Sequence, residues 1–196
     1  MLLKLISAAT LLVALSGCAA SYNPPSKSKE ADIVNDKNKA YVIFGVEKIG
    51  HFHHILEYFP ETETFKPVTI VRYNQKYIYP VDAGTHYFYR TGEGGDDFLR
   101  VDTGKGKKYF VRVDTDFLTF NISLAGAFGL FPATDKESIE GFSERVLVDN
   151  SQRTMEWFKE KNDDPEFITD IKEMFLDWRE DEMKDETMFE KDGVTL

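Results

Sequence analysis

The chain has 196 residues, of which 42% are hydrophobic and 14% are aromatic, and a formal net charge of −10. This composition supports one domain with a packed core and argues against a disordered protein. Nearly all of the charge belongs to residues 135–196, where acidic residues outnumber basic ones by about two to one. We interpret this region as an acidic surface in water, which disfavours binding to nucleic acid because phosphate would be repelled.

Residues 1–18 have the layout of a secretory signal that ends in a lipid-attachment site. Lys4 precedes an apolar run from Leu5 to Leu15. This run is too short to cross a membrane, because a spanning helix needs about 20 apolar residues. The sequence Leu15-Ser16-Gly17-Cys18 resembles the lipobox of bacterial lipoproteins, in which the cysteine is acylated and becomes the mature N-terminus.

Cys18 is the only cysteine in the sequence, so the mature body would have no internal disulfide and no thiolate metal site. Two acyl chains hold a protein stably on a membrane, since each buried methylene contributes about 0.8 kcal/mol. The resemblance implies that lipid on Cys18 anchors the protein. Because Ala19 and Ala20 follow the cysteine, it also implies the periplasmic face of the cell outer membrane. An ordinary secretory signal with an incidental cysteine is the alternative.

Residues 19–38 contain two prolines, several serines and no apolar periodicity, which is typical of a flexible tether. We expect this tether to hold a folded body, residues 39–149, away from the membrane. Short runs of β-branched and aromatic residues between turn residues predict that the body is an antiparallel β-sandwich of about seven to nine strands. The expected strands are 40–46, 51–59, 65–73, 76–81, 85–90, 98–102, 108–113, 117–124 and 144–148. Pro67 favours an edge position for the third strand or marks its start.

The period of the apolar residues changes in residues 150–196, which we predict to be an acidic helical segment. Asp164 and Pro165 are suited to begin a helix, and apolar residues follow at helical spacing from Phe167 to Trp178. A shorter helix is expected over 151–161. We expect the apolar stripes of both helices to pack on the β-sandwich, with docking onto a partner as the alternative.

Two short sequences are similar to those of uncharacterised bacterial lipoproteins that carry a small transthyretin-like or PEGA-like β-sandwich. They are Asp82-Ala83-Gly84-Thr85-His86 and Gly106-Lys107-Lys108-Tyr109-Phe110-Val111-Arg112. The resemblance covers about residues 40–113 and, more loosely, 144–161. Ala83 and Phe110 depart from the proline and second tyrosine of that group. The resemblance implies architecture and location, places His86 in a turn or in the core, and supplies no catalytic residues.

The clearest candidate for metal chemistry is the sequence His51-Phe52-His53-His54. On a strand, His51 and His53 would project from one face and could share a zinc or copper ion, with Asp or Glu completing the site. Ordinary packing of a strand is the alternative. No phosphate-binding loop, nucleophile elbow or metalloprotease motif occurs in the sequence. We therefore expect no enzymatic activity and no cofactor.

The apolar, glycine-spaced run from Ala125 to Pro132 is a candidate contact surface. If they are exposed, Phe128, Leu130 and Phe131 would bind a protein partner, since apolar patches in water usually mark such sites. Coverage by the C-terminal helices is the alternative. The sequence thus predicts a lipid-anchored lipoprotein that acts as a binding or assembly module with an envelope protein as its partner. A periplasmic metal-binding protein is the second hypothesis.

Overall fold

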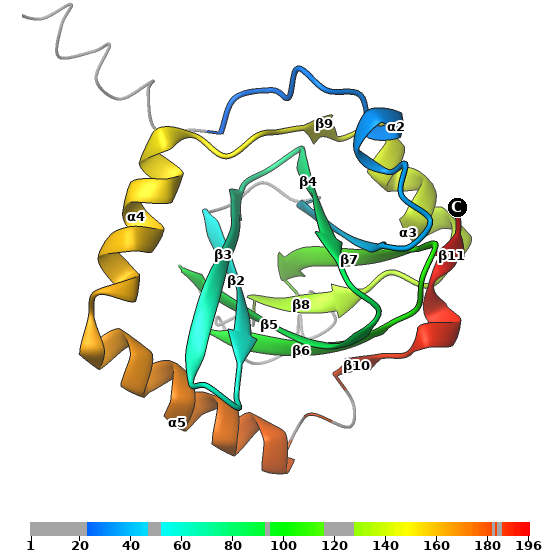
Figure 1. Ribbon diagram of the computed structural model, residues 1–196. Coiled ribbons are helices and arrows are strands. Elements are labelled where there is room, and N and C mark those ends of the chain that lie inside the picture. Colours follow the sequence, from blue (N-terminus) through cyan, green and yellow to red (C-terminus); the bar gives the residue numbers. More distant parts are fainter. Residues whose placement is uncertain (1–22, 47–51, 93–94, 116–127, 182, 184–185) are drawn as a thin grey trace, which may run out of the picture.

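The computed structural model describes residues 23–46, 52–92, 95–115, 128–181, 183 and 186–196. The protein is mainly β, with helices at the periphery of the strands (Figure 1). The strands are β1 (Ala40–Val46), β2 (His53–Phe59), β3 (Thr64–Val71), β4 (Gln75–Val81), β5 (Gly84–Gly92), β6 (Asp97–Thr103), β7 (Lys107–Thr115), β8 (Phe128–Pro132), β9 (Val146–Leu147), β10 (Thr187–Met188) and β11 (Val194–Thr195). The helices are α2 (Glu30–Ile33), α3 (Lys136–Gly141), α4 (Gln152–Asn162) and α5 (Pro165–Asp181), with 3-10 turns η2 (Phe142–Glu144) and η3 (Glu190–Asp192).

The strands form two sheets. One has the order β11-β7-β1-β4-β9, with β8 also paired to β7, and the other has the order β10-β6-β5-β2-β3. The prediction of a mainly β fold is confirmed, but pairing is not antiparallel throughout. The pairs β1–β7, β4–β9 and β6–β10 are parallel, so both sheets are mixed. The chain leaves the larger sheet for β2–β3 and again for β5–β6, so no local hairpin fixes the direction in which β7 returns beside β1.

The inner faces of the two sheets pack around a shared core. Val42 and Phe44 of β1 meet Phe88 of β5 there, and the rings of Phe44 and Phe88 lie edge to face with centroids 5.0 Å apart. The alternate residues of β1, including Tyr41 and Ile43, belong to a second cluster on the outer face. β1 is therefore buried on both faces, which explains why its sequence is almost continuously apolar rather than alternating.

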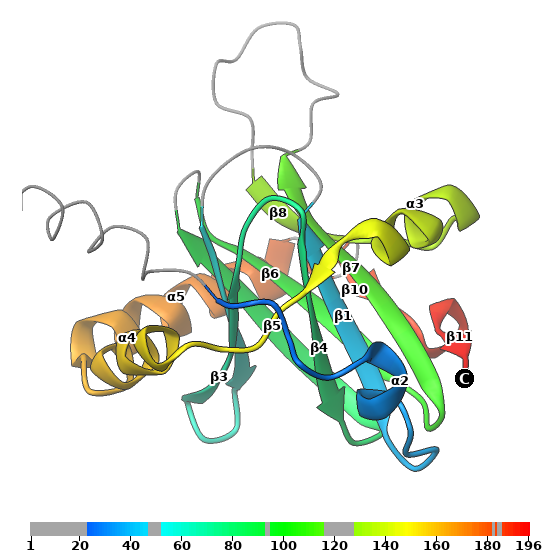
Figure 2. The same ribbon diagram turned by 90° about the horizontal axis from the view of Figure 1, so that it is seen from above.

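Helices cover the outer face of each sheet (Figures 1 and 2). α4 and α5 lie on the five-stranded sheet, where Phe158, Phe175 and Trp178 pack against residues of β2, β5 and β6. The helical stripe predicted between 167 and 178 therefore packs on the sheet. Both helices begin where the sequence predicts: the Ser151 side chain accepts a hydrogen bond from the Thr154 N–H, and Asp164 accepts from the N–H groups of the first turn of α5.

The flexible tether expected over residues 19–38 differs from the structure in residues 23–38. Pro25 forms a β-bridge with Val148, and α2 lies beside the outer cluster of the six-stranded sheet, to which it contributes Ile33. Lys76 Nζ lies 2.8 Å from Glu30 Oε2. Ile33, Val34, a few backbone hydrogen bonds and a few side-chain contacts hold this segment on the body, a pattern too short to produce a visible period in the sequence. Residues 19–22 lie outside the described part of the chain.

In the C-terminal segment, the described part of α5 ends at Asp181 and short strands follow, with the 3-10 turn η3 between them. After α5, β10 pairs with β6 of one sheet and β11 pairs with β7 of the other. The boundary expected at residue 150 therefore does not separate a body from an appendage, because residues 187–195 add strands to both sheets. Two-residue strands form through pairing with existing edges and leave no pattern in the sequence.

The strand expected over 117–124 and the signal over 1–18 fall outside the described residues. In the part of the chain that is described, helices are either too short or too polar to cross a membrane. Pro67 lies in β3, which is an edge strand, and the ladder between β2 and β3 shifts its register beside this proline. The edge position predicted for Pro67 is confirmed, and it arises because proline has no N–H to donate.

Candidate functional site

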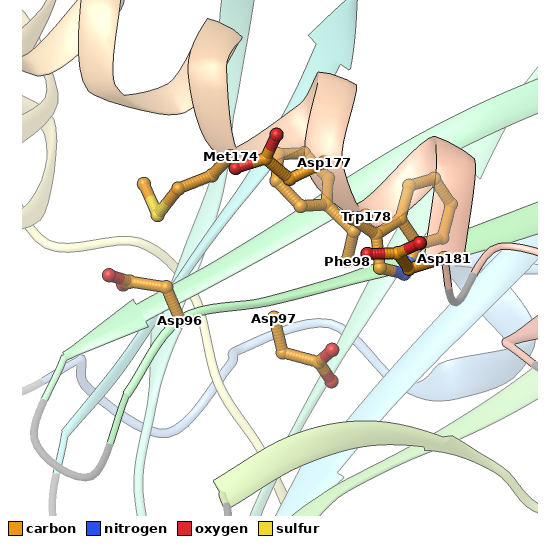
Figure 3. A pocket seen from close by; sticks show the side chains of 7 residues that line it. All are labelled: Asp96, Asp97, Phe98, Met174, Asp177, Trp178 and Asp181. Atoms are coloured by element: carbon orange, nitrogen blue, oxygen red, sulfur yellow. The ribbon is translucent and has the colours of Figure 1, made fainter.

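A pocket of about 230 Å³ lies between the C-terminal half of α5 and the start of β6 (Figure 3). Phe98 and Trp178 are 2% and 5% exposed, and their ring centroids lie 5.4 Å apart, so they form an aromatic side of the pocket. Aspartates from both elements surround these rings. The lining residues are Asp96, Asp97, Phe98, Met174, Asp177, Trp178 and Asp181.

Two periodicities place these side chains. On α5, residues 174, 177, 178 and 181 are three or four positions apart and therefore share one side of the helix. On β6, neighbouring residues point to opposite faces, so Phe98 packs toward α5 while Asp97 turns toward the other sheet. The Trp178 indole donates a hydrogen bond to Glu186 Oε2, which fixes the ring at the pocket.

The four aspartates are not equivalent. Asp97 accepts a hydrogen bond from the Leu130 N–H, which occupies one carboxylate oxygen. Asp96 lies near the buried Tyr89 hydroxyl, whose pKa is raised by burial and further by the charge of Asp96. Asp177 and Asp181 are exposed, and neither makes an ion pair with any residue whose position is described. The pocket therefore holds two carboxylates that are available to a ligand.

The arrangement of Asp177 and Asp181 is electrostatically unfavourable in the free protein. They are four residues apart on one helix, where like charges cost about 0.2 to 0.5 kcal/mol. They also lie in the last turns of α5, where the helix dipole is negative and favours cations instead. A positively charged group in the pocket would relieve both effects, and the aromatic rings of Phe98 and Trp178 would add an attractive surface for it.

The structure gives no support to a metal site at His53. Its Nδ1 accepts hydrogen bonds from Arg90 Nε at 3.1 Å and Nη2 at 2.9 Å, and both residues are at most 1% exposed. A guanidinium always donates, so this nitrogen is occupied and a fixed positive charge lies beside it. His51 lies outside the described residues. Among the residues that are described, no three potential metal ligands converge.

The partner-binding surface predicted at Phe128, Leu130 and Phe131 is wrong for Leu130. That side chain is 1% exposed and belongs to the core between the sheets. Phe131 is partly buried, with the Arg112 guanidinium 5.7 Å from its ring centre, and nothing is described of the Phe128 side chain. Residues 128–132 pair with β7 as β8, which places Leu130 in the core between the sheets rather than under the C-terminal helices. At Gly129 a Cβ would lie only 2.7 Å from Asp97 Oδ2, which explains the glycine.

His86 contacts a turn residue and a buried carboxylate. Its Nδ1 lies 2.6 Å from Glu57 Oε1 and its Nε2 lies 3.0 Å from the Asp82 carbonyl oxygen. The Tyr79 hydroxyl donates to the other oxygen of Glu57 at 2.7 Å. Glu57, His86 and Tyr79 together connect β2 and β5 of one sheet with β4 of the other, and their polar atoms are hydrogen-bonded within the fold.

His54 should make the stability of the protein depend on pH. Its ring stacks on Trp157 with centroids 4.0 Å apart, and its Nδ1 is buried with no hydrogen-bond partner among the described residues. Burial lowers the pKa of His54 from 6.5 to about 4, against the opposing effect of a hydrogen bond with the Thr91 backbone. Between about pH 4 and pH 6.5, His54 therefore binds more protons in the unfolded chain than in the folded one. The free energy of unfolding should fall by about 2 kcal/mol between pH 7 and pH 5.

Urea unfolding at pH 7 and pH 5, for the natural protein and for His54→Phe, measures this contribution. Phenylalanine keeps the stacking on Trp157 and removes the titrating group, so the loss of stability on acidification should be smaller in the variant. Identical pH dependence in the two proteins would exclude His54 as its source.

Sequence reasoning missed the pocket. Asp97 and Asp181 are far apart in the chain, and no motif in the sequence connects them. The available signal was on α5, where Asp177 and Asp181 flank Trp178 at helical spacing. Nothing in the sequence says that this helix lies against β6, which is what turns two surface charges into the rim of a pocket.

Comparisons with known proteins do not assign the chain to a family. It matches no protein-family model, and a search of curated proteins finds no match either. The resemblance to lipoproteins with a transthyretin-like or PEGA-like domain therefore stays a prediction.

Proposed function

We propose that the protein is a lipid-anchored lipoprotein of the cell envelope, held through Cys18 at the periplasmic face of the outer membrane. Its body, a β-sandwich of two mixed sheets, acts as a non-enzymatic binding module. The lipobox and the preceding apolar run support the anchor. The pocket between α5 and β6 supports the binding role, and it is the single observation that carries it.

The ligand that fits this pocket best is a basic side chain of an envelope protein. Available carboxylates at Asp177 and Asp181 attract a cation, and the rings of Phe98 and Trp178 offer apolar area to the methylene stem of lysine or arginine. A bare metal ion fits less well, because the described carboxylates do not converge as a set of ligands. Unsatisfied like charges at the rim are a local cost to stability that binding of a cation would remove.

Nuclear magnetic resonance with short peptides tests the binding role. Three peptides that differ only in one central lysine, arginine or norleucine would be titrated into the soluble body while the indole N–H resonance of Trp178 is followed. The lysine or arginine peptide should shift this resonance in a saturable way, and added salt should weaken the effect. An equal response to the norleucine peptide, or none to any of them, would contradict the proposal.

Removing the charges of Asp177 and Asp181 should abolish peptide binding without lowering the stability of the protein. In Asp177→Asn/Asp181→Asn we expect the response to the lysine peptide to be lost, while the free energy of unfolding rises by a few tenths of a kcal/mol, about the cost of a like-charge pair. The matched control is Glu173→Gln/Glu180→Gln, which removes two charges from exposed faces of α5 outside the pocket. The control should bind like the natural protein, and peptide titration with urea unfolding checks both variants.

Mass spectrometry of the mature protein from its native cells tests the anchor. The proposal requires an N-terminal Cys18 that carries fatty acyl groups. A mature chain that lacks Cys18, or carries it without acyl groups, would contradict the anchoring role and leave the binding role to the peptide titration.

A further inference from the structure

The chain is fixed to the body at Asn23, only five residues after the proposed lipid site. Asn23 is 5% exposed. Its amide group donates to the Ile70 carbonyl oxygen at 2.8 Å and to Thr69 Oγ1 at 3.2 Å, both on β3. Its side-chain Oδ1 accepts from the Ser151 N–H at 2.8 Å and from the Thr154 hydroxyl at 2.6 Å, at the start of α4.

The neighbouring backbone strengthens this attachment. The Pro24 carbonyl oxygen accepts from the Asp149 N–H at 3.0 Å, and the Ser26 N–H donates to the Leu147 carbonyl oxygen at 2.8 Å. A buried amide whose donors and acceptor are all satisfied is costly to pull out, because water must then replace several bonds at once and buried partners lose theirs. We call Asn23 and these partners the N-terminal latch.

The latch sets a short limit on how far the body can lie from the membrane. The five peptide units from Cys18 to Asn23 span at most about 18 Å when fully extended. A chain free up to residue 38 would reach about 70 Å by the same rule. The body has a radius of gyration of about 16 Å for its size, so its diameter exceeds the shorter of these two distances. Only the part of its surface around the latch can therefore stay close to the lipid headgroups.

We infer that the body lies directly on the lipid surface with one fixed face toward it, the face around Asn23, rather than hanging on a long tether. This inference rests on the proposed lipidation of Cys18. The face contains the start of α4 and the β3–β4 turn. Next to this turn, Gln75 Nε2 donates to the backbone carbonyl oxygen of Asn23 at 3.4 Å. Tyr73 in this turn and Val146 beside it are 49% and 41% exposed, so apolar side chains are available to the headgroup region.

The β2–β3 turn marks the opposite end of the same strand. Glu61 in this turn is exposed, and β3 runs from there to the latch over about 20 Å, the length of six residues in a strand. Gln152 is exposed and follows Ser151 directly. The two positions therefore report on the near and far ends of the body.

Short-range quenching by lipid headgroups tests this orientation. The full acylated chain would carry a fluorophore on Gln152→Cys or Glu61→Cys, since acylation leaves Cys18 without a free thiol. Each protein would be reconstituted into phosphatidylethanolamine and phosphatidylglycerol vesicles that contain a lipid with a spin-labelled headgroup. We expect quenching to be several-fold stronger at position 152 than at position 61.

A lengthened leader provides the control that leaves the latch and the fold intact. Insertion of about 20 Gly and Ser residues after Ala20 extends the reach and should lower quenching at position 152 to the value at position 61, with an unchanged melting temperature. Asn23→Ala, which removes the side chain of the latch, should also lower quenching at position 152. Equal quenching at the two positions in the acylated protein of natural length would overturn this inference alone, whereas absence of acyl groups on Cys18 would overturn it together with the anchor.

Discussion

The Glu57→Ala variant should lose about 3 to 5 kcal/mol of its free energy of unfolding, the usual result of removing one partner from a buried charged pair. Glu57 is 4% exposed and accepts hydrogen bonds from His86 and Tyr79. Truncation leaves the buried Tyr79 hydroxyl and the partly buried His86 Nδ1 without this acceptor, at the place where the two sheets are joined. Total stabilities are about 5 to 15 kcal/mol, so this one change should bring the protein close to unfolding.

Urea unfolding with matched variants isolates this effect. Glu61→Ala removes an exposed carboxylate from the adjacent turn and should change stability by no more than about 0.5 kcal/mol. Tyr79→Phe leaves the bond to His86 in place and should cost about 1 kcal/mol. A Glu57→Ala variant as stable as Glu61→Ala would show that the network is not a structural link between the sheets.

The same carboxylate makes a distinct contribution at acidic pH. Burial by itself would raise the pKa of Glu57, but the hydrogen bonds from His86 and Tyr79, with the charges of His86 and Lys66, hold it below the ordinary value of 4.5. A depressed carboxylate pKa stabilises the fold fully above pH 4.5, and this stabilisation is lost as the pH falls further. It is therefore lost at lower pH than most of the effect of His54, which acts between about pH 6.5 and 4.

Phe175→Ala is the second change for which we expect a large effect, a loss of about 3 to 5 kcal/mol. Phe175 is 2% exposed, and its ring centroid lies 5.1 Å from that of Tyr58, 5.2 Å from Tyr87 and 5.4 Å from Phe98. Truncation would open a cavity between α5 and the five-stranded sheet. It would also remove support from Phe98 and Trp178, so the response to the lysine peptide should weaken.

Leu176→Ala is the matched control for Phe175→Ala. Leu176 is the next residue of the same helix but is 38% exposed, so its truncation should cost much less. Urea unfolding gives the stability of each variant. Similar losses for the two variants would mean that α5 does not depend on packing against the sheet, contrary to the aromatic cluster described above.

Strands and helices were well predicted wherever a local pattern was long enough. β1 occupies the residues predicted for it, and α4 and α5 begin at the caps that Ser151 and Asp164 provide. Errors arose where pairing with a distant segment decided the structure. Leu130 belongs to a strand because β7 offers an edge, and residues 187–195 form strands because both sheets have open edges beside them. Such pairing depends on contacts far apart in the sequence.

The candidate sites show the same limit. The metal site at the histidine cluster was predicted from spacing along one strand. In the structure His53 accepts a hydrogen bond from Arg90 of the neighbouring strand, so its Nδ1 is not free to bind a metal. The tether was predicted from composition, yet Asn23 finds its partners on β3 and α4, which lie far along the chain. In both cases a polar side chain has no visible partner in the sequence and hydrogen-bonded partners in the fold.

The sequence by itself determined the mainly β class, the extent of most strands, the two C-terminal helices and the predicted lipid site at Cys18. These depend on residue type, period and short motifs, all of which are local. Only the tertiary structure decided the parallel pairs, the fixed position of Asn23 and the pocket between α5 and β6. Each of these joins groups from distant parts of the chain, and burial, hydrogen bonding and charge act on whichever groups the fold brings together.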